Sequence, residues 1–244
     1  MKIIVCGASG RMGKQLIEII RKSNCHKIAA AVDVIRPEGE FFCCCDINEV
    51  TEKADVIIDF SHHSATPALL SYALEKKMPI VIAPTGHTDE EKAAAAQASK
   101  SIPVFMSGNM SIGIALLMKL VRETVKIFPD ADVEIVETHH NQKLDVPSGT
   151  ALMLAKAASD EKKNSTLVIG RHENGKRRPE EIGIHSIRSG RVVGEHEVRI
   201  DTGTQTLVLK HEAHSRELFA EGAVTAAEYL LTRECGMFDV QSLL

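Results

Sequence analysis

The chain has 244 residues, of which 44% are hydrophobic, so it can form one large packed domain or two modest ones. A formal net charge of -4 with no tryptophan argues against a nucleic-acid surface, because binding a phosphate backbone requires a basic field. The chain has no apolar run of about 18 residues and no signal-peptide layout at its start, so we expect a cytoplasmic protein, no membrane partner and a small ligand.

From residue 2 onward, short apolar runs alternate with helical patterns. The expected strands are 2–7, 28–33, 55–60, 79–84 and 102–107, and the expected helices are 11–22, 67–77, 89–100 and 112–128. Pro67 suits a first helical turn, and Thr88 to Glu91 has the pattern of a capping box. This alternation is typical of βαβ units and predicts an α/β fold with a Rossmann-like, doubly wound parallel sheet.

After residue 130 the pattern changes to strand-like segments separated by turn pairs. The expected strands are 132–138, 166–170, 184–188, 191–200 and 204–211, with one helix at 149–158. This order predicts a second α+β domain on a mostly antiparallel sheet. We therefore expect a dinucleotide-binding domain at 1–110, completed by the C-terminal helix within 217–244, and a substrate-binding and oligomerisation domain at 111–216.

Two further segments have plain interpretations. The charged run from 171 to 181 is most simply a solvated loop. The consecutive residues Cys43, Cys44 and Cys45 suit neither a disulfide nor the paired spacing of a zinc site, so we expect reduced thiols and no metal.

The first strand is followed by the sequence GASGRMG, with glycines at Gly7, Gly10 and Gly13. Such a loop lets backbone N–H groups and a helix N-terminus approach a pyrophosphate. Asp33 ends the second strand, where an acid can bind the hydroxyls of an adenosine ribose. The context predicts dinucleotide binding, and the alternative is a glycine-rich turn that serves packing alone. Arg11 could contact a phosphate or be an ordinary surface arginine.

The stretch ETHHNQKLDVPSGTALMLA, residues 137–155, precedes and opens a helix. Strand alternation places His139 and His140 on opposite faces, which argues against a two-histidine metal site. Ser148 suits an N-cap, so that the N–H groups of Gly149 and Thr150 face outward as an anion site. Lys143 adds a positive charge, and either histidine can supply a proton near neutral pH. The alternative is an ordinary capped helix after a polar loop.

Together, a dinucleotide loop, an anion site and a proton donor favour reduction of an unsaturated carboxylic acid or imine. Two rivals remain open. A dehydrogenase of an amino or hydroxy acid would use a similar cofactor loop, and a dinucleotide-sensing protein without catalysis would need neither Lys143 nor His139.

The chain also resembles the dihydrodipicolinate reductase (4-hydroxy-tetrahydrodipicolinate reductase) family of lysine and diaminopimelate synthesis. The resemblance rests on GASGRMG, on the pattern E-x-x-E-x-H-H-x-x-K-x-D-x-P-S-G-T-A from Glu134 to Ala151, on SIRSGRVVGEHEV from Ser186, and on HSRELFAEGA from His214. It implies an NADH- or NADPH-dependent reductase of a small dicarboxylate that forms a homotetramer through the sheet of the second domain.

The resemblance also implies roles for single residues. It places the proton donor at His139 and the catalytic lysine at Lys143, with His140, Ser148, Gly149 and Thr150 binding the substrate. The implied cofactor-binding residues are Gly7, Ala8, Gly10, Arg11, Met12, Gly13, Asp33, Phe60, Pro84, Thr85, Gly86, Gly108, Asn109, Met110, Arg216 and Phe219.

The sequence departs from the family pattern near the adenosine end of the cofactor. The run from Asp33 to Asp55 is shorter than in many members, and Val34 stands where some members carry an arginine. Asp33 favours the ribose hydroxyls of NADH and opposes a 2′-phosphate. We therefore predict that NADH is used at least as efficiently as NADPH.

Overall fold

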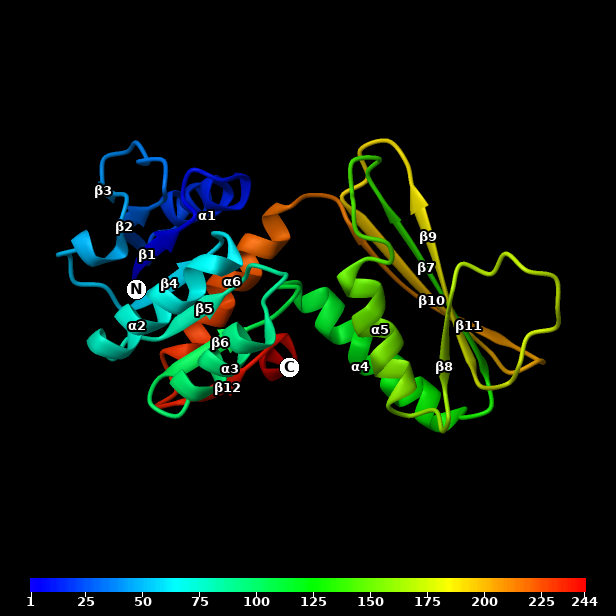
Figure 1. The fold of residues 1–244 in the computed structure, drawn as a ribbon. Coiled ribbons are helices and arrows are strands. Elements are labelled where there is room, and N and C mark those ends of the chain that lie inside the picture. Colours follow the sequence, from blue (N-terminus) through cyan, green and yellow to red (C-terminus); the bar gives the residue numbers. More distant parts are fainter. The chain divides into compact units, whose positions relative to one another are not determined.

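In a computed structural model that describes residues 1–244, the chain folds into two units, each with its own sheet (Figure 1). The first unit comprises Met1–Ser111 and Arg216–Leu244, and the second comprises Ile112–Ser215. None of the helices has the length and apolarity that crossing a membrane requires.

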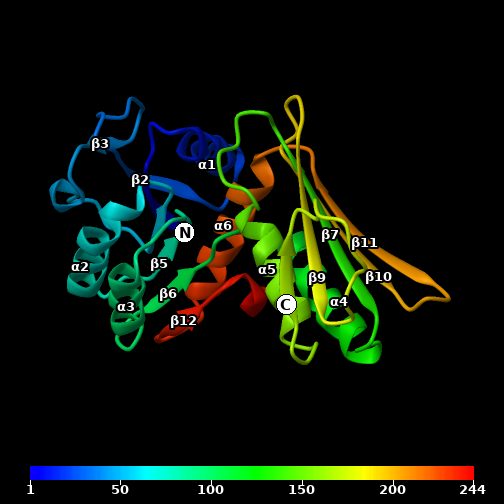
Figure 2. The same ribbon diagram turned by 45° about the vertical axis from the view of Figure 1, so that its right-hand side comes forward.

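The first unit is built on a parallel sheet with the strand order β12-β6-β5-β4-β1-β2-β3. The strands are β1 (Lys2–Cys6), β2 (Lys27–Val32), β3 (Phe42–Cys44), β4 (Val56–Asp59), β5 (Ile80–Ile82), β6 (Pro103–Met106) and β12 (Gly236–Phe238). The helices are α1 (Arg11–Lys22), α2 (Thr66–Lys76), α3 (Asp89–Ala98) and α6 (Glu217–Leu230), with short 3-10 turns at Ile47–Glu49, His63–Ala65 and Val240–Leu243. Helices α1 and α6 cover one face and α2 and α3 the other (Figures 1 and 2). The doubly wound fold is confirmed.

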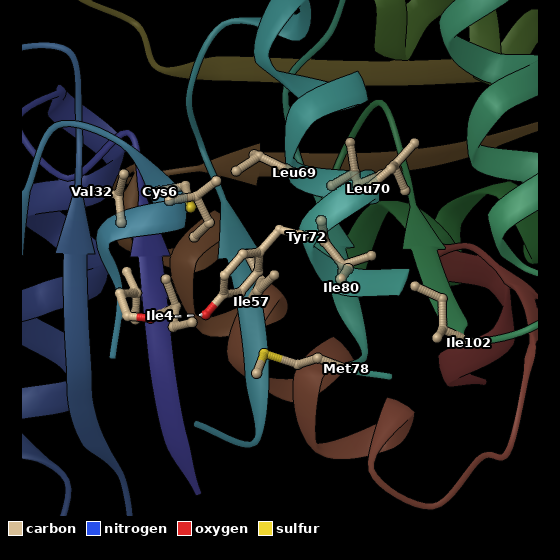
Figure 3. Packing of buried hydrophobic residues seen from close by; sticks show 14 of the residues in the cluster. Ile4, Cys6, Val32, Ile57, Leu69, Leu70, Tyr72, Met78, Ile80 and Ile102 are labelled. Carbon is tan, nitrogen blue, oxygen red and sulfur yellow. Dashed lines mark hydrogen bonds between the residues drawn. The ribbon is translucent and has the colours of Figure 1, made fainter. Parts of the chain in front are cut away.

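The core of this unit explains why its strands have nearly continuous apolar sequences. Side chains from β1, β4 and β5, among them Ile4, Ile57 and Ile80, meet Leu69 and Tyr72 of α2 (Figure 3). Parallel strands covered on both faces must be apolar on both faces. Each fully buried aliphatic side chain contributes about 1.5–3 kcal/mol, so this layer fixes the positions of the loops at the strand ends.

Local signals in this unit agree with the structure, but two strands were not predicted. Thr88 and Glu91 form the expected capping box on α3, and Pro67 lies in the first turn of α2. Strand β3 contains Cys43 and Cys44, and β12 pairs with β6. Both strands have only three residues, which is too short for alternation to be recognised.

The second unit has a five-stranded mixed sheet with the order β11-β10-β7-β9-β8. Its elements are α4 (Ile112–Ile127), β7 (Asp132–His139), α5 (Gly149–Ser159), β8 (Thr166–Ile169), β9 (Glu181–Arg188), β10 (Gly194–Asp201) and β11 (Thr206–Ala213). Strand β10 pairs antiparallel with β11 and β7 over long registers, whereas β9 pairs parallel with β7 and β8. Helices α4 and α5 cover one face of the sheet, and no helix of this unit covers the other (Figures 1 and 2).

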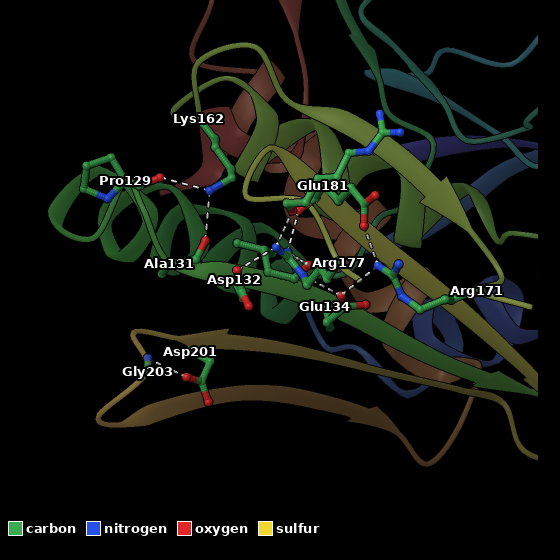
Figure 4. A network of polar contacts seen from close by, with 12 residues as sticks. Pro129, Ala131, Asp132, Glu134, Lys162, Arg171, Arg177, Glu181, Asp201 and Gly203 are labelled. Carbon is green, nitrogen blue, oxygen red and sulfur yellow. Dashed lines mark hydrogen bonds and ion pairs between the residues drawn. The ribbon is translucent and has the colours of Figure 1, made fainter. Parts of the chain in front are cut away.

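The charged segment 171–181 differs in one respect from the solvated loop that we predicted. Residues 171–176 are exposed, but the side chain of Arg177 is only 18% exposed because it lies over the open face of the sheet. Its guanidinium donates to the carboxylates of Asp132 and Glu134 and to the carbonyl of Glu181 (Figure 4). The five N–H donors of an arginine can satisfy several acceptors on neighbouring strands at once, so this residue ties the loop to β7 and β9.

Candidate functional site

The turn after β1 leaves no room for side chains at two of its glycines. Gly7 has a φ of 73°, and a Cβ there would lie 2.6 Å from the carbonyl oxygen of Phe60. A Cβ on Gly13 would lie 2.7 Å from the Cα of Ala8 and would overlap the carbonyl of Gly7. Gly10 is the N-cap of α1. The loop is therefore tightly seated, and its backbone can approach a phosphate at the N-terminus of α1.

A cleft of about 500 Å³ lies beside this loop, at the carboxyl ends of β1, β2 and β4. Asp33 lines it, and its Oδ2 accepts a 2.9 Å hydrogen bond from the N–H of Ser9. The lining also includes Ile47, Ala68 and Leu69, whose apolar side chains suit a flat heteroaromatic ring. The remaining lining residues are Cys6, Gly7, Gly10, Val32, Val34, Cys45, Asp46, Phe60, Ser61, His62, Ser64 and Ala65. The lining residues 45–47 come from the run between Asp33 and Asp55 at the expected adenosine end, and the sequence had not assigned them to the site.

The other expected cofactor residues follow the carboxyl ends of strands in the same unit or begin α6. Phe60 follows β4, Pro84–Gly86 follows β5, and Gly108–Met110 follows β6. The turn at Gly108–Met110 is closed locally, since the Oδ1 of Asn109 accepts a 2.8 Å hydrogen bond from the N–H of Ser111. Arg216 is the N-cap of α6, Phe219 is half-buried, Met12 is half-buried and Arg11 is exposed. Crevices at the carboxyl ends of parallel strands are where such sheets bind ligands.

In the second unit, neighbouring strands bring polar side chains together at the carboxyl end of β7. Glu137 lies opposite Ser186 of β9 and His196 of β10. It is fully buried, and its oxygens accept 2.9 Å hydrogen bonds from Nη1 and Nη2 of Arg188. Oε2 also contacts Nδ1 of His139 at 2.5 Å, and Oε1 accepts from the N–H of Ser148 at 3.2 Å. A buried carboxylate with this many donors is a fixed negative charge.

The hydrogen bonds determine the charges of this group. Burial alone would raise the pKa of Glu137, but hydrogen bonds from Arg188 and His139 outweigh it and lower the pKa to about 2. Burial lowers the pKa of His139, although Glu137 opposes that shift. Burial and the neighbouring His139 lower the pKa of His196 to about 3. Near neutral pH both histidines are therefore neutral, and the bond to Glu137 assigns the His139 proton to Nδ1.

The opposite side of the His139 ring is left open by a glycine. A Cβ on Gly194 of β10 would lie 3.0 Å from Nε2 of His139. The edge of the His196 ring lies against the same imidazole, with the ring centroids 5.1 Å apart. His139 therefore has one nitrogen fixed by Glu137, while the other stays available to exchange a proton.

The loop between β7 and α5 carries the remaining expected residues. Ser148 is the N-cap of α5, since its Oγ accepts 3.2 Å from the N–H of Ala151, and that Oγ lies 3.1 Å from Nε2 of His196. Lys143 Nζ lies 2.8 Å from Oδ1 of Asp145. The N–H of Gly149 also lies near the Asp145 carboxylate and, after Lys143, helps to lower its pKa. Lys143 and the start of α5 thus meet around one carboxylate.

Two of the expected substrate residues lie next to this group. Thr150 is 9% exposed in the first turn of α5. His140 is half-buried just after the last residue of β7, and its carbonyl accepts a hydrogen bond from the N–H of Lys143. The two adjacent histidines differ as strand alternation predicts, because His139 is buried against Glu137.

Sequence reasoning assigned no role to Glu137, Arg188 or His196. One signal was present, because alternation placed Glu137 on the same face as the apolar Val133 and Ile135 of β7. A carboxylate on a buried face requires a cationic partner. The partner could not be identified from spacing, since Arg188 lies 51 residues further along the chain.

Comparison with protein families covers nearly the whole chain. Residues 1–110 match the model of the dihydrodipicolinate reductase N-terminus, and residues 113–244 match that of the dihydrodipicolinate reductase C-terminus. The chain belongs to the dihydrodipicolinate reductase family. The models meet where the first unit gives way to the second, and the C-terminal model continues through residues 216–244 of the first unit.

Similar proteins agree with that membership. The chain is 42% identical to the 4-hydroxy-tetrahydrodipicolinate reductase of Caldanaerobacter subterraneus subsp. tengcongensis, covering 100% of this chain and 98% of that relative. It is 39% identical to the reductase of the same name from Clostridium novyi, with the same coverage. Among solved structures, the dipicolinate-bound dihydrodipicolinate reductase from Paenisporosarcina sp. TG-14 matches with a TM-score of 0.82 at 22% identity, covering 100% of this chain and 99% of the other. At that identity the likeness speaks for the fold alone.

Proposed function

We propose that the chain uses NADH or NADPH to reduce dihydrodipicolinate (4-hydroxy-tetrahydrodipicolinate) to tetrahydrodipicolinate in lysine and diaminopimelate synthesis. The observation that carries the proposal is the group at the end of β7, where the Nδ1 of His139 is bonded to the buried carboxylate of Glu137. Lys143 and the N-terminus of α5 lie in the same unit. A proton donor with two anion-binding groups suits a cyclic imine dicarboxylate.

In the proposed mechanism, Lys143 and the first turn of α5, at Ser148, Gly149 and Thr150, bind one carboxylate of the substrate. A bound dianion favours the protonated form of a nearby histidine, so it raises the pKa of His139 and places a proton on Nε2. Glu137 stabilises the resulting imidazolium and holds its ring in place. His139, assisted by Lys143, then delivers the proton that accompanies the reduction, and His140 lines the substrate site.

The geometry of the glycine loop and the cleft in the first unit fits a dinucleotide. Gly7, Gly10 and Gly13 would hold the pyrophosphate, and Asp33 would bind the adenosine ribose at the cleft. When bound, the dihydronicotinamide supplies the hydride. The residues that we propose beside it are Phe60, Pro84, Thr85, Gly86, Gly108, Asn109, Met110, Arg216 and Phe219, with Ala8, Arg11 and Met12 at the phosphates.

The test is oxidation of NADH or NADPH, followed at 340 nm, with substrate freshly made by the preceding synthase. We expect turnover by the wild-type chain and a fall in kcat of about 10² to 10⁴ in Lys143→Ala, with cofactor affinity changed by no more than a few fold. His139→Ala should lower kcat less if water can substitute. Turnover of amino or hydroxy acids instead would support the dehydrogenase rival. Cofactor binding without turnover of any substrate would support the sensing protein.

We further propose that NADH serves at least as well as NADPH. In support, Asp33 lines the cleft, whereas Arg36 lines a separate hollow with Lys14 and Arg21 of α1. The side chain at Val34 offers no charge, and an exposed ionic contact from Arg36 contributes only about 1 kcal/mol. The measurement is kcat/KM for each cofactor at saturating substrate. A preference for NADPH above about tenfold would contradict the proposal, and Val34→Arg should shift the ratio toward NADPH.

The oligomeric state is a separate proposal, namely a homotetramer assembled through the open face of the sheet in the second unit. That face carries the exposed apolar residues Ile187 of β9 and Val208 of β11, with exposures of 46% and 47%. Apolar side chains on a sheet face without helices favour burial against another subunit. Light scattering should give the mass of four chains, and Ile187→Asp should lower it. A monomeric wild-type chain would contradict the proposal.

A further inference from the structure

A carboxylate of the protein already lies where we place a carboxylate of the substrate. Asp145 Oδ1 is 2.8 Å from Nζ of Lys143, and the N–H of Gly149 lies near the same carboxylate. These are the two donors to which the proposed mechanism assigns the substrate. In the ligand-free chain they therefore bind an internal anion.

We propose that Asp145 is a specificity-determining residue, whose carboxylate occupies the substrate carboxylate position at Lys143 and Gly149 and is displaced only by an incoming anion. The inference rests on the proposed function, because it takes Lys143 and α5 as substrate ligands. It adds a competitor to that site, which neither the family membership nor the mechanism requires.

The surroundings of Asp145 allow its side chain to leave while its backbone stays in place. Nη2 of Arg188 donates a 2.7 Å hydrogen bond to the carbonyl of Asp145, which anchors the backbone to the buried pair with Glu137. The Asp145 side chain is 57% exposed, whereas that of Lys143 is 22% exposed. A rotation about the side-chain bonds would carry the carboxylate into solvent, where water can hydrate it.

The exchange also sets which ligands can bind. A carboxylate that replaces Asp145 restores the charge pairing with Lys143 and presents an oxygen to the N–H of Gly149. A neutral carboxamide or ester could also present an oxygen there but would leave Lys143 without its ion pair. A half-exposed ion pair is weak, so an anion can displace Asp145 from Lys143 at low cost. A neutral ligand that displaces Asp145 leaves Lys143 without an ion pair and is therefore disfavoured.

The test compares dipicolinate binding to the full-length chain and to Asp145→Asn by titration calorimetry. Asparagine keeps an oxygen for Gly149 but removes the competing charge, so we expect dipicolinate to bind about threefold to tenfold more tightly. The matched control is Asp160→Asn, which removes the partner of Lys156 at 2.8 Å near the other end of α5. That variant should bind dipicolinate like the wild-type chain.

A second measurement reports on the surroundings of the Gly149 N–H. The amide resonance of Gly149 should differ between the ligand-free wild-type chain and ligand-free Asp145→Asn, and the difference should disappear once both are saturated with dipicolinate. Unchanged or weaker binding to Asp145→Asn, or a difference that persists in the bound state, would overturn the role of Asp145 alone. Failure of the wild-type chain to bind dipicolinate would overturn this inference together with the proposed substrate site.

Discussion

Glu137→Gln should damage both stability and catalysis, because it removes the charge at the centre of the second unit and keeps the side-chain shape. Folding lowers the pKa of Glu137 from 4.5 to about 2, and each pKa unit corresponds to about 1.4 kcal/mol, so its ionised form contributes about 3 kcal/mol. Since the pKa is lowered, this contribution is present above about pH 4.5 and is lost as the pH falls toward 2. The variant should therefore be less stable by about 3 kcal/mol at pH 7.

The catalytic effect follows from the hydrogen bonds. Oε1 and Oε2 accept from Arg188, and in addition from Ser148 and His139. A glutamine must turn its NH₂ group toward one of these donors, which either forces His139 into the other tautomer or leaves Ser148 unpaired. Losing the charge also lowers the pKa of His139 further, because Glu137 raises it. We expect kcat to fall by about 10² to 10³ and the pH profile to move to lower pH.

The assay combines urea unfolding at several pH values with the pH dependence of kcat. The matched control is Glu134→Gln on the same strand, whose carboxylate also contacts an arginine and a histidine, at 3.0 Å from Arg177 and 2.8 Å from His185, but on the open face of the sheet (Figure 4). That variant should lose some stability and keep its pH profile. A Glu137→Gln enzyme with kcat within threefold of wild type and the same profile would refute the reasoning.

Three further changes test other parts of the structure. Asp59 is fully buried, and burial raises its pKa from 3.8 to about 6, so its contribution favours folding at low pH and is lost as the pH rises through that range. In urea titrations, Asp59→Asn should be up to about 3 kcal/mol more stable than wild type at pH 8 and should lose that gain near pH 4. Gly222→Ala should lower the melting temperature, by about 1–3 kcal/mol of stability, because a Cβ there would overlap the carbonyl of Met110; a melting temperature at or above wild type would contradict this contact. Gly194→Ala should reduce kcat more than stability, because its Cβ would lie 3.0 Å from Nε2 of His139; Gly175→Ala, with nothing within 4 Å, is the control in both assays.

The sequence allowed the elements with strong periodicity to be predicted, and the structure confirms them. The glycine loop and the N-cap at Ser148 depend on residues close together in the chain, so local chemistry was enough to find them. The contacts around Glu137 depend on the register of β7, β9 and β10, which joins positions about 50 to 60 residues apart. Arg177 was assigned to solvent for the same reason, since its acceptors lie on other strands. Spacing along the chain carries no information on such pairs.

The return of the chain to its first unit has a consequence for synthesis on the ribosome. Strand β12 supplies the edge of the first sheet beside β6, and α6 buries Ala223, Ala227 and Leu230 against that unit. Until these residues emerge, the part of the sheet face that α6 covers and the β6 edge stay uncovered, whereas residues 112–215 are already complete. The second unit can therefore finish folding first, and the nascent first unit presents an open sheet edge, the kind of surface that pairs with other chains and that chaperones bind.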